Sequence, residues 1–290
     1  MFQSISFPYE DQLMREIELR GYSLSTFKNY KSHLRRLAEF CSKDICQVEV
    51  EECKQYLLYL QKDLGFGPDT TNTCVSAFLF FQQAVLGNPI SPVALPKRKK
   101  PKALPVILSK DQIFSLLDAF PLRDRTVLSL CYGSGLRLRE ALSLRIQDID
   151  SKTGRLFVYY GKGGSDRYTI LSAFSLALLR RYYKAYRPKG PLLFPGRSGD
   201  RPLASQNIQA AFKSVVFGMF PLTYEKITIH TLRHCFATHL LDQNYDLRTI
   251  QLLLGHKSIQ STCIYLHLSS QRFSMIISPL DRKDGDSPGL

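Results

Sequence analysis

The sequence predicts a mainly α-helical protein of two domains, with a small antiparallel β-sheet in the second domain. Three observations support this fold class. In about the first third of the chain, apolar residues recur at three- and four-residue steps, the period of amphipathic helices. A segment rich in proline and lysine, 96–107, separates that part from the rest of the 290-residue chain. Farther along, two short β-prone runs flank the glycine-rich sequence GKGGSD.

Four helices are expected before the linker. Gly21 ends the first helix, and Ser23 or Ser25 caps the second. Two more helices are expected over 48–63 and 69–86, separated by GFGP. The second helix carries a core stripe formed by Phe27, Tyr30, Leu34, Leu37 and Cys41.

Two groups of basic residues are candidates for contact with a polyanion. One is a row on the second helix, about 100° around from the core stripe, formed by Lys28, Lys31 and Arg35. The other is a cluster in the linker, formed by Lys97, Arg98, Lys99, Lys100 and Lys102. Such a cluster repels itself unless a polyanion neutralises it. A solvated helix face and a plain solvated linker are the alternatives, and the sequence leaves both open.

Composition favours a nucleic-acid partner and a reducing compartment. The formal net charge is +14, while the 44% hydrophobic content is that of a folding chain. Apolar runs stay below the roughly 18–20 residues that a membrane span needs, and the N-terminus lacks the order of a signal peptide. The seven scattered cysteines form no C-x-x-C pair, which argues against disulfides and zinc fingers. We therefore expect a cytoplasmic, nucleoid-associated protein.

The second domain is predicted to alternate helices with a hairpin. Helices are expected near 109–119 and 124–132, followed by the GSG turn and a helix to about Leu144. The β-prone runs cover Arg155–Tyr160 and Arg167–Leu171. Helices follow from Ala173 onward.

Arg137 and Lys162 are the first candidates for chemistry. Arg137 opens a helix directly after a turn, where free backbone N–H groups favour an anion, and Glu140 three residues later lies on its face. Lys162 lies at the hairpin tip between glycines that permit close approach to a ligand. Taken singly, an Arg/Glu pair at this spacing is most often an ordinary helix-surface ion pair, and a lysine at a hairpin tip is usually just exposed to solvent.

The segment HTLRHCFATHLL places chemistry and core on different faces of one helix. His230, Arg233 and His234 share a face, whereas the core stripe is Leu232, Phe236 and Leu240. Thr228 is the expected N-cap, so the helix dipole at His230 and Arg233 favours a negative ligand. Zinc is the competing interpretation, but no H-E-x-x-H glutamate is present and an arginine separates the two histidines.

His256 and Tyr265 complete the set. His256 follows the helix-ending Gly255, which fixes it at an exposed point suited to a hydrogen bond with a substrate. Tyr265 lies on a helix that Ser258 caps. A surface histidine and a packed aromatic ring are the alternatives for these two residues.

Read together, these elements resemble the catalytic domain of the tyrosine recombinases, also called the phage integrase family. G-x-G-L-R-x-x-E, G-K-G, H-T-L-R-H, L-G-H and S-T-x-I-Y follow one another in that order, and the resemblance runs from about Leu108 to Leu268. It is nearest to Xer-like and integron-integrase-like members. The part before the linker is similar to the family's core-binding domain by pattern and position. One departure is Gly164 and Ser165, where related chains often carry a further basic residue.

The resemblance implies a C-shaped DNA clamp of two domains. A helical SAM-like core-binding domain then spans 1–95, the basic linker 96–107, and the tyrosine recombinase catalytic domain 108–280, followed by a tail over 281–290. The catalytic domain ends in an exchange segment, roughly Gln271 to Leu280, that docks on a neighbouring subunit. Its apolar anchors are Phe273, Met275, Ile276, Ile277 and Leu280. Packing on their own domain is the alternative.

The resemblance also implies strand cleavage without metal, ATP or another cofactor. Tyr265 then forms a 3′-phosphotyrosyl link, which conserves the energy of the phosphodiester. Arg137 and Arg233 grip the non-bridging oxygens, as planar guanidinium groups suit. By the same resemblance, Lys162 donates a proton to the leaving 5′-oxygen, and His230 assists proton transfer at the tyrosine. His256 donates a hydrogen bond to the phosphate. Glu140 orients Arg137, and His234 supports the helix or the phosphate surroundings.

The implied partners are double-stranded DNA recombination sites and other recombinase subunits. Strand exchange through a Holliday junction requires a homotetramer, or a heterotetramer with a related recombinase. Two other functions stay open at this point. One is a DNA-binding protein that has lost catalysis, and the other is strand cleavage and religation like that of a type IB topoisomerase.

Overall fold

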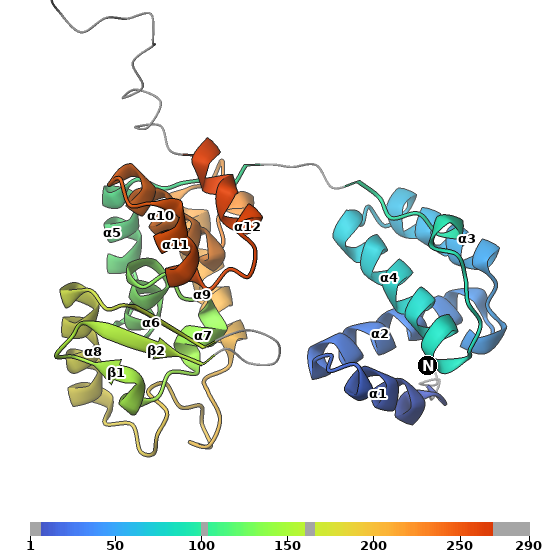
Figure 1. The fold of residues 1–290 in the computed structure, drawn as a ribbon, viewed down its shortest axis with the longest axis horizontal. Helices are drawn as coiled ribbons and strands as arrows, with labels where there is room; N and C mark the ends of the chain where they lie inside the picture. The colour runs from blue at the N-terminus through green and yellow to red at the C-terminus, as the bar shows by residue number, and fades with distance from the viewer. Residues whose placement is uncertain (1–6, 100–103, 160–165, 269–290) are drawn as a thin grey trace, which may run out of the picture. The chain divides into compact units, whose positions relative to one another are not determined.

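The computed structural model describes residues 7–99, 104–159 and 166–268, and these are mostly helical with one small antiparallel sheet (Figure 1). The chain divides into two compact units, residues 1–103 and 104–290, and each has its own buried apolar core. The mainly helical fold class with a small sheet is thereby confirmed. The limits of the linker and of the exchange segment, and the clamp, stay predictions. No helix in the described ranges is long and apolar enough to cross a membrane.

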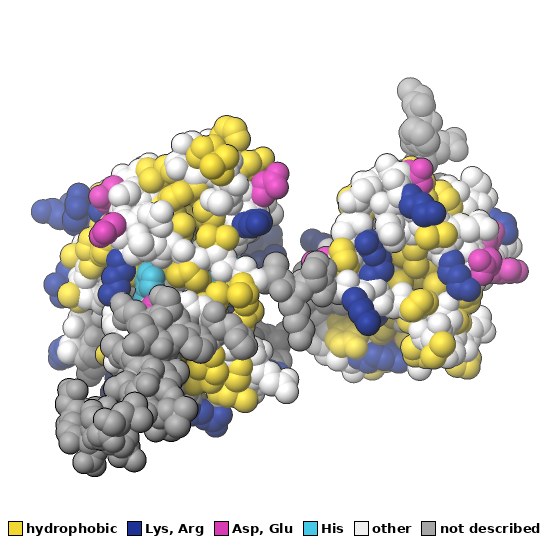
Figure 2. Space-filling model, turned by 90° about the horizontal axis from the view of Figure 1, so that it is seen from above, with side chains coloured by type: hydrophobic (Ala, Val, Ile, Leu, Met, Phe, Trp, Pro, Cys, Tyr) yellow, Lys and Arg dark blue, Asp and Glu magenta, His cyan; other side chains and the backbone are white. Residues whose placement is uncertain are grey.

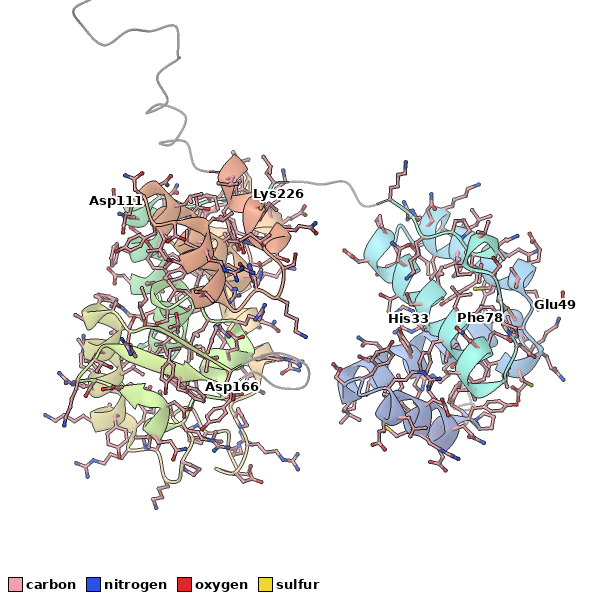
Figure 3. All side chains as sticks on the ribbon, viewed as in Figure 1. His33, Glu49, Phe78, Asp111, Asp166 and Lys226 are labelled. Carbon is pink, nitrogen blue, oxygen red and sulfur yellow. The ribbon has the colours of Figure 1, made fainter. Side chains whose placement is uncertain are left out.

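The first unit is a bundle of four helices. They are α1 (Glu10–Leu19), α2 (Leu24–Cys41), α3 (Val50–Lys62) and α4 (Pro68–Phe80). The Ser23 hydroxyl accepts the Thr26 N–H at 3.2 Å and so caps α2. In the predicted stripe of α2, Phe27, Leu34 and Leu37 are buried. The helix packs against α4, which contributes the fully buried Phe78 (Figure 3).

The predicted basic residues of the first unit differ in their surroundings. On α2, Lys31 forms an ion pair with Glu10 and Arg35 one with Glu39, while Lys28 is exposed. In the linker, Lys97 and Lys99 are exposed, and Lys100 and Lys102 lie outside the described residues.

Arg98 is held against the first unit. Its backbone N–H donates to Asn72 Oδ1 at 2.8 Å, and Asn72 Nδ2 donates to the Arg98 carbonyl at 3.0 Å. The Arg98 guanidinium donates to the Phe66 carbonyl at 3.1 Å. The Asn72 side chain and the Phe66 carbonyl therefore hold the start of the basic segment against the first unit.

The second unit combines helices with the sheet. Its helices are α5 (Lys110–Asp118), α6 (Leu122–Gly133), α7 (Leu138–Leu142), α8 (Ala173–Tyr186), α9 (Ser205–Met219), α10 (Ile229–Asp242), α11 (Leu247–Leu254) and α12 (Gln260–Cys263). The strands, in the order β1-β2-β3, are β1 (Ile149–Asp150), β2 (Arg155–Val158) and β3 (Arg167–Ile170). The sequence did not predict β1, because two residues are too few to show an alternating pattern. Helix α7 also ends earlier than the predicted Leu144.

Helix α6 lies at the centre of this unit. Every residue from Thr126 to Cys131 is buried, since α8 and α10 both pack against it. A helix covered on several sides loses the amphipathic period of a surface helix. Its end at Gly133 leads directly into the turn at Gly135 that begins the functional site.

Candidate active site

Arg233 lies at the base of the site and is fully buried on α10. Its Nη1 donates to the Gly135 carbonyl and its Nη2 to the Leu254 carbonyl, both at 2.5 Å. The Nε atom has no hydrogen-bond partner among the described residues. A buried guanidinium with a spare donor is costly unless an acceptor arrives, so an anionic ligand is the natural partner.

A single carboxylate, that of Glu140, holds three arginines together. It accepts the backbone N–H and Nη1 of Arg137, each at 2.8 Å. It also accepts both Nη atoms of Arg167, at 3.1 and 2.8 Å, and lies 3.7 Å from Arg233 Nη1. Burial opposes ionisation of Glu140, but the hydrogen bond and charge of Arg167, the Arg137 backbone N–H and the Arg233 charge outweigh it and lower its pKa to about 2.

Arg167 is the site residue that sequence reasoning missed. It is 7% exposed, and its Nε donates to the Leu253 carbonyl at 2.9 Å. It thus joins β3 to Glu140 and to the end of α11. Alternation alone misleads on this strand, because Tyr168 and Ile170 form the more apolar set yet are exposed, whereas Arg167, Thr169 and Leu171 face inward. A charge on a buried face needs a partner.

Gly255 leaves the space that Arg167 fills. It ends α11 in the left-handed region, with φ of 65°. A Cβ at this position would stand 2.7 Å from Arg167 Cδ. The predicted glycine stop is confirmed, and it also brings His256 next to the arginine cluster.

Tyr265 lies inside this site, in the 3-10 turn η6 (Ile264–His267), and is 1% exposed. His234 Nδ1 lies 3.1 Å from its hydroxyl. The His256 ring is nearly parallel to the tyrosine ring, with centroids 6.4 Å apart. The contact at the hydroxyl thus belongs to His234, whereas the sequence assigned help at that atom to His230.

His230 and His256 flank the tyrosine differently. His230 is exposed, and its ring meets that of His234 edge-on at 4.7 Å. His256 is half-buried, so the prediction that it lies at an exposed point is wrong. The hydroxyl of the fully buried Thr262 lies 2.9 Å from His256 Nδ1 and orients the ring. In the tautomer in which the Thr262 hydroxyl donates to Nδ1, the ring proton is on Nε2 and can be donated to a ligand.

Burial and positive charge keep the inner histidines neutral. Burial, then the charges of Arg233 and Arg137, lower the pKa of His256 to about 4. Burial, then His230 and Arg233, lower that of His234 to about 4. Burial raises the pKa of Tyr265, against the opposing effect of Arg233 and Arg137. At neutral pH the site therefore combines cationic arginines, neutral histidines and a protonated tyrosine.

A cleft of about 740 Å³ adjoins the site. Arg137, Arg139, Lys213 and His230 contribute to its lining. Figure 2 shows histidine and basic side chains beside one another on a face of this unit. Lys162 and the segment Gln271 to Leu280 lie outside the described residues.

Replacing Glu140 by Gln is expected to lower the free energy of unfolding at pH 7 by about 3–5 kcal/mol, because three arginines lose their shared counter-charge. The folded-state pKa of about 2 lies below the ordinary 4.5. This stabilisation is therefore complete above pH 4.5 and is lost as the pH falls toward 2. Denaturant titrations at pH 7 and pH 3 measure it.

The matched control is Glu51→Gln, which removes an exposed pair with Lys54 and is expected to cost less than about 1 kcal/mol. Equal stability of Glu140→Gln and wild type at pH 7 would contradict the arginine cluster as described.

Comparison with known proteins assigns both units. The model of the phage integrase family matches residues 107–272, and that of the phage integrase N-terminal SAM-like domain matches 10–91. The tyrosine recombinase XerC of Vibrio campbellii is 32% identical over 289 aligned residues, covering 92% of this chain and 90% of that protein. The tyrosine recombinase of Thermosipho africanus is 30% identical and covers 87% and 92%.

Solved structures agree in fold. The crystal structure of the XerH site-specific recombinase bound to a palindromic difH substrate, in a post-cleavage complex, superposes with a TM-score of 0.67. It is 22% identical and covers 91% of this chain and 83% of that one.

Proposed function

The chain belongs to the phage integrase family of tyrosine-type site-specific recombinases, enzymes that act on DNA, and from that premise we propose that it exchanges strands through a covalent 3′-phosphotyrosyl intermediate formed on Tyr265. One observation carries the proposal above all. Two arginine forks, Arg137 and Arg233, are held by Glu140 beside a buried tyrosine. A phosphodiester is the ligand whose charge and shape such a pair fits.

The proposed reaction is an in-line attack on phosphorus. Arg137 and Arg233 bind the non-bridging oxygens, whose charge grows in the transition state. His256 donates a hydrogen bond to the same phosphate, and Lys162 protonates the leaving 5′-oxygen. Arg167 and Glu140 act as positioning residues for the arginine pair. Covalent capture stores the energy of the broken bond for the rejoining step, so the proposed cycle needs no ATP, metal or other cofactor.

The proposed partners are double-stranded recombination sites and other recombinase subunits. A clamp formed by the two units would enclose each site, aided by the basic residues Lys97 and Lys99. Four subunits, identical or paired with a related recombinase, would hold two sites, with Gln271 to Leu280 docking on a neighbour. We place this activity in the cytoplasm at the nucleoid, where such DNA is found.

Strand exchange between two DNA sites tests the function. Plasmids carrying paired sites from the DNA that flanks the gene are incubated with the wild-type protein in EDTA. Recombinant products and a Holliday junction intermediate are expected. Supercoil relaxation without any recombinant would favour the topoisomerase-like alternative, and binding without cleavage would favour a purely DNA-binding role.

Salt is expected to weaken DNA binding steeply, because each neutralised phosphate releases condensed counterions. With about 6–10 phosphate contacts, affinity should fall by about 10³–10⁵ between 50 and 200 mM salt. Titrations by fluorescence anisotropy at several salt concentrations measure the slope. A flat response would be inconsistent with a clamp built on basic residues.

A further inference from the structure

His234 is the histidine that contacts the Tyr265 hydroxyl, through Nδ1 at 3.1 Å. We propose that His234 is a catalytic residue, the base that receives the hydroxyl proton as Tyr265 attacks DNA. This inference rests on the proposed function. It differs from the sequence-based prediction, which gave that task to His230.

The geometry favours a direct transfer. Hydrogen-bond reach is the first requirement for a general base, and 3.1 Å meets it. The two ring centroids lie 5.7 Å apart. Because Tyr265 is only 1% exposed, bulk water has little access to the hydroxyl, so a side chain must take the proton.

The groups around His234 keep it ready to accept. His230 and Arg233 lie beside it on α10, and Tyr265 faces it from η6. Farther away are the charges of Arg137 at the N-cap of α7, Glu140 on α7 and Arg167 on β3, and the neutral His256 before α12. Its pKa of about 4 leaves the imidazole neutral near pH 7, so a nitrogen lone pair can accept the proton. The same burial and positive charge make it a weak base, whose imidazolium readily gives the proton back during rejoining. The raised pKa of Tyr265 makes unaided ionisation rare, so assistance has a large effect.

His230 is the less suitable base. It is exposed, and its ring meets the ring of His234 edge-on. Its influence on the tyrosine therefore passes through its contact with the His234 ring. Two histidines four residues apart on one helix thus take different tasks.

The proposed step balances without an added reagent. As the bond from Tyr265 Oη to phosphorus forms, the bond from phosphorus to O5′ breaks. The tyrosine proton passes to His234 Nδ1, and O5′ receives a proton from the general acid, Lys162. Rejoining reverses each transfer, and the imidazolium of His234 returns its proton to the departing phenolate.

Single-turnover cleavage of a nicked suicide substrate, followed from pH 6.5 to 9.5, tests the role. His234→Ala is expected to cleave about 10²–10⁴-fold more slowly at pH 7. Its rate should then climb with pH, because the space left by the imidazole admits hydroxide to the tyrosine, and added imidazole that enters the same space should restore part of the rate. Lowered rates in constant proportion at every pH, without rescue by imidazole, would mean a merely structural role and overturn the proposal.

His239→Ala is the matched control. His239 lies on the same helix, is also half-buried, and its Nδ1 contacts a tyrosine hydroxyl, that of Tyr132, at 2.9 Å. The His239→Ala substitution removes a similar contact between a histidine and a tyrosine hydroxyl, at a position that does not involve Tyr265. Its cleavage rate is expected to stay within about threefold of wild type, the scale of one lost neutral hydrogen bond.

His234→Asn separates proton transfer from positioning and serves if the alanine variant does not fold. The amide oxygen replaces Nδ1 as an acceptor but cannot hold a proton at these pH values. Cleavage as slow as expected for His234→Ala supports the proposal, while cleavage at the wild-type rate overturns it. Absence of cleavage by the wild type itself would count against the proposed function rather than against the role of His234.

Discussion

Tyr265→Phe is expected to abolish covalent attachment to DNA while leaving affinity for the site nearly unchanged. The substitution removes the atom proposed to form the bond to phosphorus, so we expect no neighbouring group to compensate. It preserves the buried ring, and the lost contact with His234 Nδ1 costs about 1 kcal/mol of stability. The loss of covalent attachment is measured on suicide substrates in EDTA, by counting the protein–DNA adducts that survive denaturation with detergent.

Tyr132→Phe is the control for this prediction. Tyr132 also loses a hydroxyl that contacts a histidine, His239, at 2.9 Å. This variant is expected to form adducts at the wild-type level. Adducts of equal yield from Tyr265→Phe would show that another side chain attacks the phosphate.

Arg233→Lys is expected to slow cleavage by about 10²-fold or more, the cost of losing one preorganised donor in a transition state. The charge is retained, but an ammonium group cannot reproduce the fork that donates to Gly135 and Leu254 together. The side chain is fully buried, so its loss acts on the geometry of the site rather than on long-range attraction of DNA. Single-turnover rates at saturating protein separate this effect from binding.

The control for Arg233→Lys is Arg180→Lys, on the exposed face of α8, for which unchanged cleavage is expected. Thermal melting of both variants shows whether the fold persists. A folded Arg233→Lys protein that cleaves within about threefold of wild type would contradict the proposed grip on the phosphate by a planar guanidinium.

Features encoded within a few residues could be predicted from the sequence. Ser23 caps α2, and Gly255 ends α11. The serine cap depends on a hydroxyl that accepts a backbone N–H within its own turn, and the glycine stop depends on the left-handed backbone that glycine adopts without strain. The core stripe of α2 followed from period alone.

The arrangement of the site depended on contacts between distant segments. Glu140 meets Arg167 across 27 positions of the sequence, and no local pattern specifies that pair. The choice between His230 and His234 is similar. Both histidines lie on one face of α10, and the packing of η6 against α10 is what brings Tyr265 to His234.

The motifs predicted which residues lie in the site better than they predicted what each residue does there. Five of the six residues assigned to catalysis lie in the described ranges, and these are Arg137, His230, Arg233, His256 and Tyr265. The hydrogen bonds of Glu140, Arg167 and Thr262 fix their surroundings. Their roles stay proposals, and so does that of Lys162.

The most direct test of the account is to locate the DNA attachment on the protein. Wild-type adducts on a suicide substrate are digested with nuclease and protease, and the peptide that retains a nucleotide is sequenced by mass spectrometry. The expected result is a 3′-phosphotyrosyl nucleotide on Tyr265. A nucleotide on any other residue would contradict the account, and so would strand exchange that proceeds with no covalent adduct at all.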